Sequence, residues 1–174
     1  VEARCGTIST DFDFYYNWRD IFPEEYRTIE IGDDEQSARQ EVIIRGMFNK
    51  EILIDLLQNF TLFMTLKAGN KIKVLARYNQ YRATGKMIER LKAGKTWQER
   101  SGVIWHTQGS GKSLTMVFLV KKMRTTFELK GFKILMVVDR LDLEDQLLTN
   151  AQLTGEAPEK PIATKSRGPN DDTP

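Results

Sequence analysis

Residues 107–114 have the types and the spacing of a phosphate-binding loop. The run Thr107-Gln108-Gly109-Ser110-Gly111-Lys112-Ser113-Leu114 places two glycines directly before a lysine and a serine. Glycines allow a backbone to turn its N–H groups toward phosphate oxygens. The ammonium group of Lys112 would reach the β- and γ-phosphates of a nucleotide, and the hydroxyl of Ser113 would coordinate Mg²⁺. The run therefore predicts a site for a nucleoside triphosphate with Mg²⁺, in which Lys112 is the catalytic residue.

A loop of this kind needs a strand before it and a helix after it. The apolar run 102–105 precedes the loop, and the apolar run 114–120 follows it. A helix that starts at the loop adds the positive end of its dipole to the phosphate site. Residues 133–139 are apolar on both faces, which is typical of a central parallel strand, and Asp142 is a suitable N-cap for a helix behind it. We therefore expect an α/β fold with parallel strands over residues 102–150.

The usual form of this loop has a glycine where this chain has His106. We consider two interpretations of this residue. It either ends the strand that enters the loop or contacts the nucleotide directly.

Two amphipathic helices are predicted ahead of the loop. The first extends from Phe48 to Met64, with apolar residues recurring on one stripe at helical spacing. The second extends from about Gln80 to Ala93, and Gly94 is well placed to end it. A glutamine at a helix start can offer both a donor and an acceptor to the edge of adenine, although an ordinary surface glutamine would look the same.

Composition limits the class of protein. The 174 residues can form one domain-sized core or parts of two, and no apolar run is long enough to span a membrane. The single cysteine, Cys5, excludes an internal disulfide, suits a reducing cytoplasm and is expected to be a buried, inert thiol. Aromatic residues gather between positions 12 and 18, where they could stack on bases or form an apolar patch that packs on a neighbour.

Charge is distributed unevenly along the chain. Residues 1–45 hold 5 Lys and Arg against 11 Asp and Glu, a net charge of −6, and the remainder holds 21 against 13, a net charge of +8. Residues 67–100 concentrate 10 of these basic residues. This segment could contact a nucleic-acid backbone or could be the solvated face of a helix.

With these motifs in place, the chain resembles the R (restriction and DNA-translocating) subunit of type I restriction enzymes, which carries a superfamily 2 helicase-type motor. The resemblance covers residues 1–148 and rests on motifs that occur in the family's order. They are Arg4-Cys5-Gly6-Thr7, Gly46-Met47-Phe48-Asn49-Lys50, Arg77-Tyr78-Asn79-Gln80-Tyr81-Arg82-Ala83, the run 102–116, and the run 138–147. The family's phosphate loop also carries a histidine at the position of His106.

The resemblance implies a division of the chain and a set of roles. Residues 1–45 would be the tail end of a nuclease domain, 46–76 a helical connector, and 77–154 the first part of a RecA-like lobe. Residues 155–174 have the composition of a disordered tail. Gln80 would read adenine, residues 107–114 would hold ATP, and Arg140 and Gln146 would lie near DNA.

The resemblance also implies a function for the intact protein. It would be an ATP-dependent, cytoplasmic type I site-specific deoxyribonuclease that translocates double-stranded DNA, acting with methyltransferase (M) and specificity (S) subunits and without a membrane. The chain itself lacks the nuclease carboxylates and the Asp-Glu-x-His element of such motors. We therefore expect an ATP-binding fragment with incomplete ATPase and nuclease sites. The alternatives are a stand-alone nucleotide-binding switch and an inactive remnant.

Overall fold

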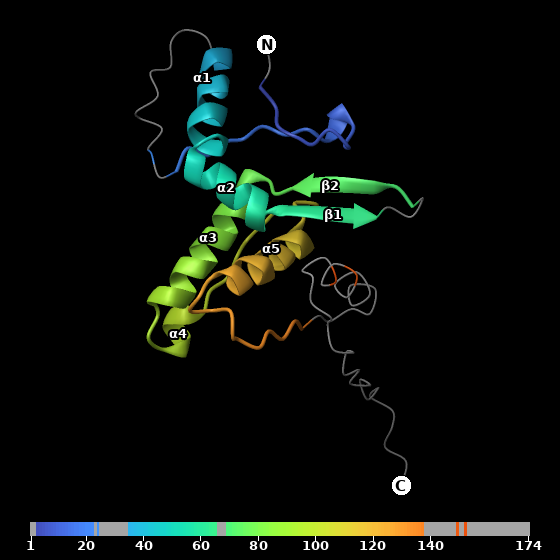
Figure 1. Ribbon diagram of the computed structural model, residues 1–174. Coiled ribbons are helices and arrows are strands. Elements are labelled where there is room, and N and C mark those ends of the chain that lie inside the picture. The colour runs from blue at the N-terminus through green and yellow to red at the C-terminus, as the bar shows by residue number, and fades with distance from the viewer. Residues whose placement is uncertain are drawn as a thin grey trace, which may run out of the picture.

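A computed structural model of the chain describes residues 3–22, 24, 35–65, 69–137, 149 and 152. The elements are shown in Figure 1. In order they are η1 (Phe12–Phe14), α1 (Glu35–Val42), the π-helical segment η3 (Ile43–Met47), α2 (Lys50–Asn59), β1 (Thr61–Thr65), β2 (Lys71–Leu75), α3 (Tyr78–Ala93), α4 (Trp97–Arg100) and α5 (Lys112–Thr125). The described sheet has two strands, β1 and β2, in antiparallel register from Thr61 opposite Leu75 to Thr65 opposite Lys71.

The predicted helix from Phe48 to Met64 is correct in its first part and wrong in its last. Helix α2 starts after Asn49, whose side chain accepts a hydrogen bond from the N–H of Glu51, and it ends at Asn59. After Phe60, residues 61–65 form β1, which buries Leu62 and exposes Phe63. Strand β2 alternates charged and apolar residues, as a half-buried strand does. The helical spacing of the apolar residues from Phe48 to Met64 hid the hairpin from the sequence interpretation.

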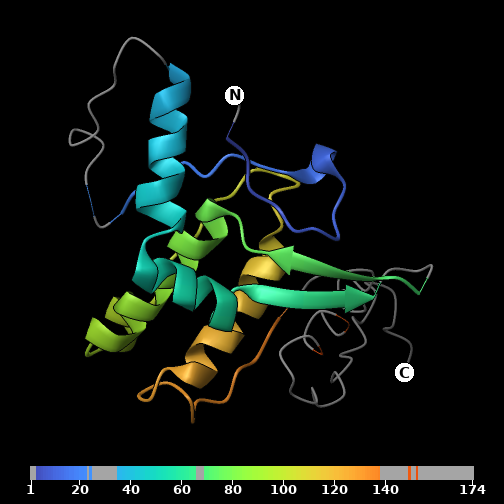
Figure 2. The ribbon, with the colours of Figure 1, turned by 45° about the horizontal axis from the view of Figure 1, so that its top comes forward.

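The prediction for the second helix is confirmed. Helix α3 spans Tyr78–Ala93, and the N–H of Gly94 donates to the carbonyl of Arg90 at its end. Thr84 and Ile88 of this helix are buried, and Ile88 packs with Met123 of α5 and with Leu129. Helices α3 and α5 pack against each other below the hairpin, and α1 projects to the opposite side (Figures 1 and 2).

One apolar core joins the N-terminal segment to the helices. Its most deeply buried residues come from the N-terminal segment, α2, β1 and α5; they are Trp18, Ile21, Leu56, Phe60, Leu62, Val117 and Phe118. The three ranges that we predicted as separate regions all contribute to this core. The division at residues 45 and 76 stays a prediction, because shared packing does not define domain boundaries.

The N-terminal segment, residues 3–22, is fastened to this core by specific contacts. Cys5 and Tyr16 form an antiparallel backbone β-bridge. The carboxylate of Asp20 forms an ion pair with the guanidinium of Arg82, with 2.8 Å between nitrogen and oxygen. A side chain at position 46 would collide with the backbone of Asp20, so a glycine there permits the close approach of η3. As predicted, the thiol of Cys5 is buried, and burial raises its pKa to about 11, which keeps it protonated at neutral pH.

The predicted parallel strands are not seen in the described part of residues 102–139. Residues 102–105 and 133–137 have no strand pairing, and Val103, Leu135 and Val137 are 94, 87 and 79% exposed. A central parallel strand is paired on both edges and covered on both faces. The described residues supply helix α5 but no third strand or second covering layer for these runs, which explains why they remain unpaired. The predicted helix that follows Asp142 and the tail from 155 lie outside the described residues.

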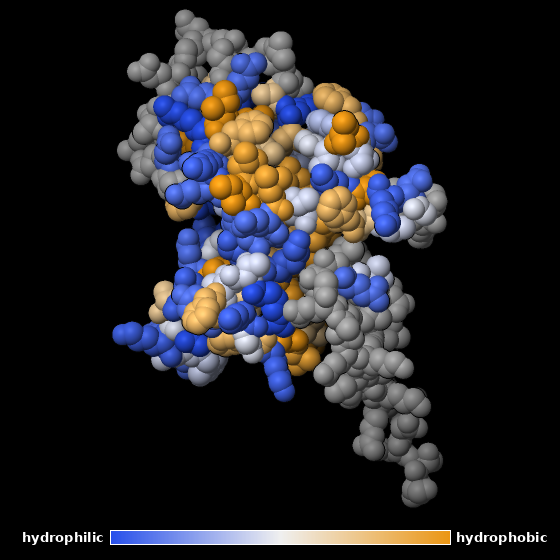
Figure 3. All heavy atoms as spheres, viewed as in Figure 1, coloured by the Kyte–Doolittle hydropathy of each residue, from blue (hydrophilic) through white to orange (hydrophobic). Residues whose placement is uncertain are grey.

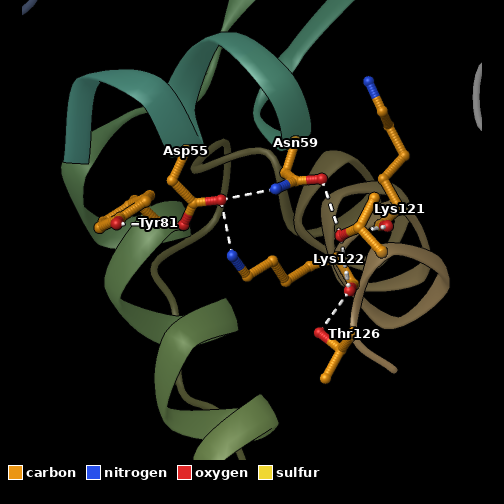
Figure 4. A network of polar contacts seen from close by, with 7 residues as sticks. Asp55, Asn59, Tyr81, Lys121, Lys122 and Thr126 are labelled. Atoms are coloured by element: carbon orange, nitrogen blue, oxygen red, sulfur yellow. Dashed lines mark hydrogen bonds and ion pairs between the residues drawn. The ribbon is translucent and has the colours of Figure 1, made fainter. Parts of the chain in front are cut away.

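A polar network joins α2, α3 and α5 beside the core. Asp55 accepts hydrogen bonds from Asn59 and Lys122, each at 2.6 Å, and from the hydroxyl of Tyr81 at 3.2 Å (Figure 4). Burial, with a smaller contribution from the Asp55 charge, raises the pKa of Tyr81 above its usual value, so this hydroxyl remains a donor. The network fixes the helix that follows the loop relative to the two helices that precede it.

The surface carries apolar as well as charged side chains. Figure 3 shows hydrophobic spheres gathered on the half of the molecule where α2 and the hairpin lie. Phe12 and Phe14 of the predicted aromatic cluster are more than 60% exposed, whereas Trp18 is buried. Within the part of the chain that is described, no helix has the length and apolar character needed to cross a membrane.

Candidate functional site

The predicted phosphate loop has the backbone geometry that its glycines permit. Gly109 and Gly111 have φ angles of +76° and +79°, which residues with side chains adopt at a cost. Gly111 is the N-cap of α5, so Lys112 and Ser113 are the first two residues of the helix. A side chain at Gly109 would meet nothing within 4 Å, which leaves open space in front of this turn. The turn at Gly109 thus borders open space, and α5 begins three residues further on, at Lys112.

Lys112 lies over its own loop. Its ammonium group donates a hydrogen bond to the carbonyl of Thr107 at 3.0 Å, and the side chain is otherwise exposed. Ser113 is half-buried, and Leu114 packs against the apolar core, where it anchors the first turn of α5. An exposed ammonium group held across a glycine turn fits the charge of a triphosphate. The predicted helix after the loop is confirmed, and the predicted strand before it is absent.

Gln80 connects the start of α3 to the loop. The side chain is 3% exposed, and its oxygen accepts from the N–H of Arg77 at 2.9 Å. Its amide nitrogen donates to the carbonyls of Ser110 and Gly111, each at 3.2 Å. A Cβ at position 111 would come within 2.5 Å of this nitrogen, so Gly111 also makes room for the glutamine. The surface-glutamine interpretation is wrong, because the side chain is buried and both ends of its amide are hydrogen-bonded.

A cavity of about 280 Å³ lies beside the loop. Three separate stretches line it, and they are 16–17 with Arg19, 77–79, and 107–110. Asn17, Asn79 and Ser110 each carry a buried side-chain oxygen with no hydrogen-bond partner among the described residues. Ser110 is only 8% exposed. The sequence interpretation did not assign Asn17, because a contact between residues about 90 positions apart leaves no local signal.

A larger cavity, of about 730 Å³, lies away from the loop. Helices α2, α3 and α5 line it, and Asp55 and Lys122 of the polar network lie at its wall. These two groups satisfy each other. The smaller cavity is the better candidate for a ligand of the loop, because residues 107–110 form one of its walls.

The remaining candidate residues divide into three groups. Arg140 and Gln146 lie outside the described residues. His106 is half-buried, and its Nδ1 has no partner among the described residues, but no strand ends there. No cluster of three His, Cys, Asp or Glu side chains that could hold a metal ion occurs in the described ranges.

Several basic residues of 67–100 are used inside the fold. Arg82 pairs with Asp20, and Lys92 pairs with Glu128 at 3.1 Å. The guanidinium groups of Arg90 and Arg100 donate to the carbonyls of Ser101 and Gly94. These contacts give the basic segment a structural use.

Comparison with known proteins identifies a family that the chain matches. A model of the SWI2/SNF2 ATPase family matches residues 79–168, which include Gln80 and the whole loop. No solved structure matches the chain.

Curated relatives are endonuclease subunits of type I restriction enzymes. The chain is 34% identical over 149 residues to the HindI endonuclease subunit of Haemophilus influenzae, covering 84% of this chain and 14% of that subunit. It is 29% identical over 162 residues to the putative MjaIXP endonuclease subunit of Methanocaldococcus jannaschii, covering 84% of this chain and 15% of the subunit. The motif-based resemblance to these subunits is confirmed, and the chain spans about one seventh of their length.

Proposed function

This chain belongs to the SWI2/SNF2 ATPase family, and from that premise we propose that residues 107–114 bind ATP together with Mg²⁺. The observation that carries the proposal is the loop itself. Two glycines at positive φ lead into α5, and the ammonium group of Lys112 lies across the turn. Backbone N–H groups, a helix N-terminus and a cation at one point form a triphosphate site.

Each residue of the loop has a proposed role. Lys112 neutralises the β- and γ-phosphates, and Ser113 ligates Mg²⁺. The backbone of Thr107, Gln108, Gly109, Ser110 and Gly111 surrounds the phosphate oxygens, and Leu114 holds the helix start in place. Gln80 positions the loop through Ser110 and Gly111, and we propose that one end of its amide turns to adenine when ATP binds. Bound Mg²⁺ would offset the phosphate charge and orient the triphosphate.

For the intact protein we propose the activity that the names of its relatives suggest. It would be the R subunit of a cytoplasmic type I restriction enzyme, coupling ATP hydrolysis to translocation and cleavage of double-stranded DNA with M and S subunits. The relatives are named as endonuclease subunits of such enzymes. Arg140 and Gln146 are the residues of this chain that we propose to lie near DNA. The unpaired runs 102–105 and 133–137 would become strands of the complete RecA-like lobe.

We expect this chain to bind ATP but to hydrolyse it poorly. Its 174 residues contain no Asp-Glu-x-His run, which would hold Mg²⁺ and position the attacking water. Phosphoryl transfer depends on such positioning. A turnover measurement with radiolabelled ATP should give a rate well below the roughly 10 s⁻¹ that is typical of enzymes. A rate near that value would contradict the proposed incomplete site and would also exclude the non-hydrolysing switch.

Titration of ATP with and without Mg²⁺ tests the proposed site. The wild-type chain should bind ATP more tightly with Mg²⁺. Replacing Ser113 by alanine should make the increase in ATP affinity on adding Mg²⁺ about tenfold smaller, because the ion loses a ligand. Ser113→Thr keeps the hydroxyl and is the matched control, which should retain the Mg²⁺ effect. Failure of the wild-type chain to bind ATP at millimolar concentration would overturn the proposal.

A further inference from the structure

We propose that the cavity of about 730 Å³ between α2, α3 and α5 is a groove that binds an amphipathic helix of a partner protein, with Lys or Arg residues beside its apolar face. The groove lies away from the phosphate loop, and none of residues 107–114 lines it. The inference therefore concerns an interaction surface and does not depend on the proposed ATP site.

The groove has the dimensions and the lining of a helix-binding site. Its lining residues on α3 extend from Tyr81 to Glu89, which is about 12 Å at 1.5 Å per residue. Buried apolar side chains form part of its lining, and Ile52, Phe60 and Ile88 are 8, 1 and 7% exposed. An amphipathic helix binds such a groove by laying its apolar face on the apolar lining and keeping its polar residues at the rims.

The walls of the groove are preformed. Asp55 of α2 accepts hydrogen bonds from Tyr81 of α3 and from Lys122 of α5, and these contacts tie the three helices together (Figure 4). Gly85 lies in the α3 wall, where a Cβ would meet nothing within 4 Å. A glycine at this point lets the backbone of a bound helix come close to α3. A preformed groove loses less free energy in ordering when a partner binds.

The charges along the groove favour a basic partner. Its two basic residues, Arg82 and Lys122, already form ion pairs with carboxylates at 2.8 and 2.6 Å. Glu51 on α2 and Glu89 on α3 also line the groove, and both are exposed. Neither has an ion-pair partner among the described residues. The two walls thus offer carboxylates to Lys or Arg residues that flank an apolar stripe.

The described helices of this chain do not offer such a helix to a second copy. Helices α3 and α5 carry most of the basic residues, but they pack against each other, with Ile88 and Met123 in one apolar cluster. Helices α1 and α2 hold one basic residue each, and α4 has only four residues. The occupant is therefore a helix of a different polypeptide.

Two model peptides test the groove on the 174-residue chain. Each has two heptads with Leu at the apolar positions, and all other positions are Lys in one peptide and Glu in the other. Fluorescence anisotropy of the labelled peptides at about 0.15 M salt measures their affinities. The Lys peptide should bind about tenfold more tightly or better, because only its side chains pair with Glu51 and Glu89.

Removal of the two carboxylates tests the charge argument. Glu51→Gln combined with Glu89→Gln should weaken binding of the Lys peptide about three- to tenfold. Asp11→Asn combined with Asp13→Asn is the matched control, because it also removes two exposed negative charges and lies outside the groove. Its affinity for the Lys peptide should stay within about twofold of wild type.

Filling the groove tests its shape. Gly85→Leu should weaken binding of the Lys peptide about tenfold or more, because the new side chain occupies the space in the α3 wall. Ala93→Leu places the same side chain at an exposed position of α3 outside the groove, and it should leave the affinity unchanged. If Gly85→Leu has a lower unfolding midpoint, the variant of the two exposed glutamates decides the question.

Several results would overturn the inference. The two peptides could bind equally, the Lys peptide could fail to bind, or loss of Glu51 and Glu89 could leave its affinity unchanged. Light scattering of the chain without peptide tests the other occupant, and a monomer is the expected result. A dimer that Gly85→Leu dissociates would assign the groove to a second copy of the chain.

Discussion

Replacing Lys112 by alanine should lower the affinity of the chain for ATP by about 100-fold. Hydrogen bonds to charged groups contribute about 1.5–3 kcal/mol, and each 1.4 kcal/mol is about a tenfold change in affinity. The ammonium group lies over the loop, so its removal leaves the phosphate charge without its nearest cation. Isothermal titration of wild type and variant with ATP and Mg²⁺ measures the difference directly.

The control for this variant is Lys86→Ala. Lys86 is exposed on α3, so its replacement removes one positive charge away from the loop. ATP affinity should stay within twofold of wild type, because a distant surface charge is screened by salt. Lys112 is itself exposed, so the thermal unfolding midpoint of Lys112→Ala should also stay close to that of wild type. Equal ATP affinity of Lys112→Ala and wild type would show that residues 107–114 are not a phosphate site.

The sequence was sufficient to predict the loop and helices α3 and α5. Local signals define these elements, since Gly109 and Gly111 adopt positive φ and Gly94 follows the end of α3. Gln80 could be singled out at a helix start, but its two bonds to the loop carbonyls could not be foreseen. The reach of a side chain across about 30 residues of sequence depends on tertiary packing.

The errors in the sequence interpretation have definable physical causes. The hairpin was missed because Phe60, buried at the end of α2, continues the same stripe into Phe63, which the strand exposes. The runs 102–105 and 133–139 were assigned as strands from their apolar character and, for the first, from the strand that a phosphate loop requires before it. Strand formation also needs partners, and the described residues do not supply them. The contribution of Asn17 to the cavity arises only from long-range packing, for which a single sequence carries no pattern.

Replacing Phe118 by alanine should lower the free energy of unfolding by about 3–5 kcal/mol, the usual cost of emptying a buried phenylalanine site. Phe118 of α5 is fully buried, and its ring centre lies 5.5 Å from that of Phe60, which in turn contacts the ring of Tyr81 at 4.7 Å. The cavity would therefore form where α2, α3 and α5 meet. Urea unfolding followed by circular dichroism measures the loss, which is large for a domain of marginal stability.

The same experiment tests whether Phe60, at the end of α2, and Phe118 of α5 pack as one unit in the core. Phe14→Ala is the control, because this ring is 64% exposed and its loss should change stability by less than about 0.5 kcal/mol. The double variant Phe60→Ala with Phe118→Ala should lose less than the sum of the single variants, because contacting residues are not additive. Full additivity, or a loss below 1 kcal/mol for Phe118→Ala, would contradict this packing.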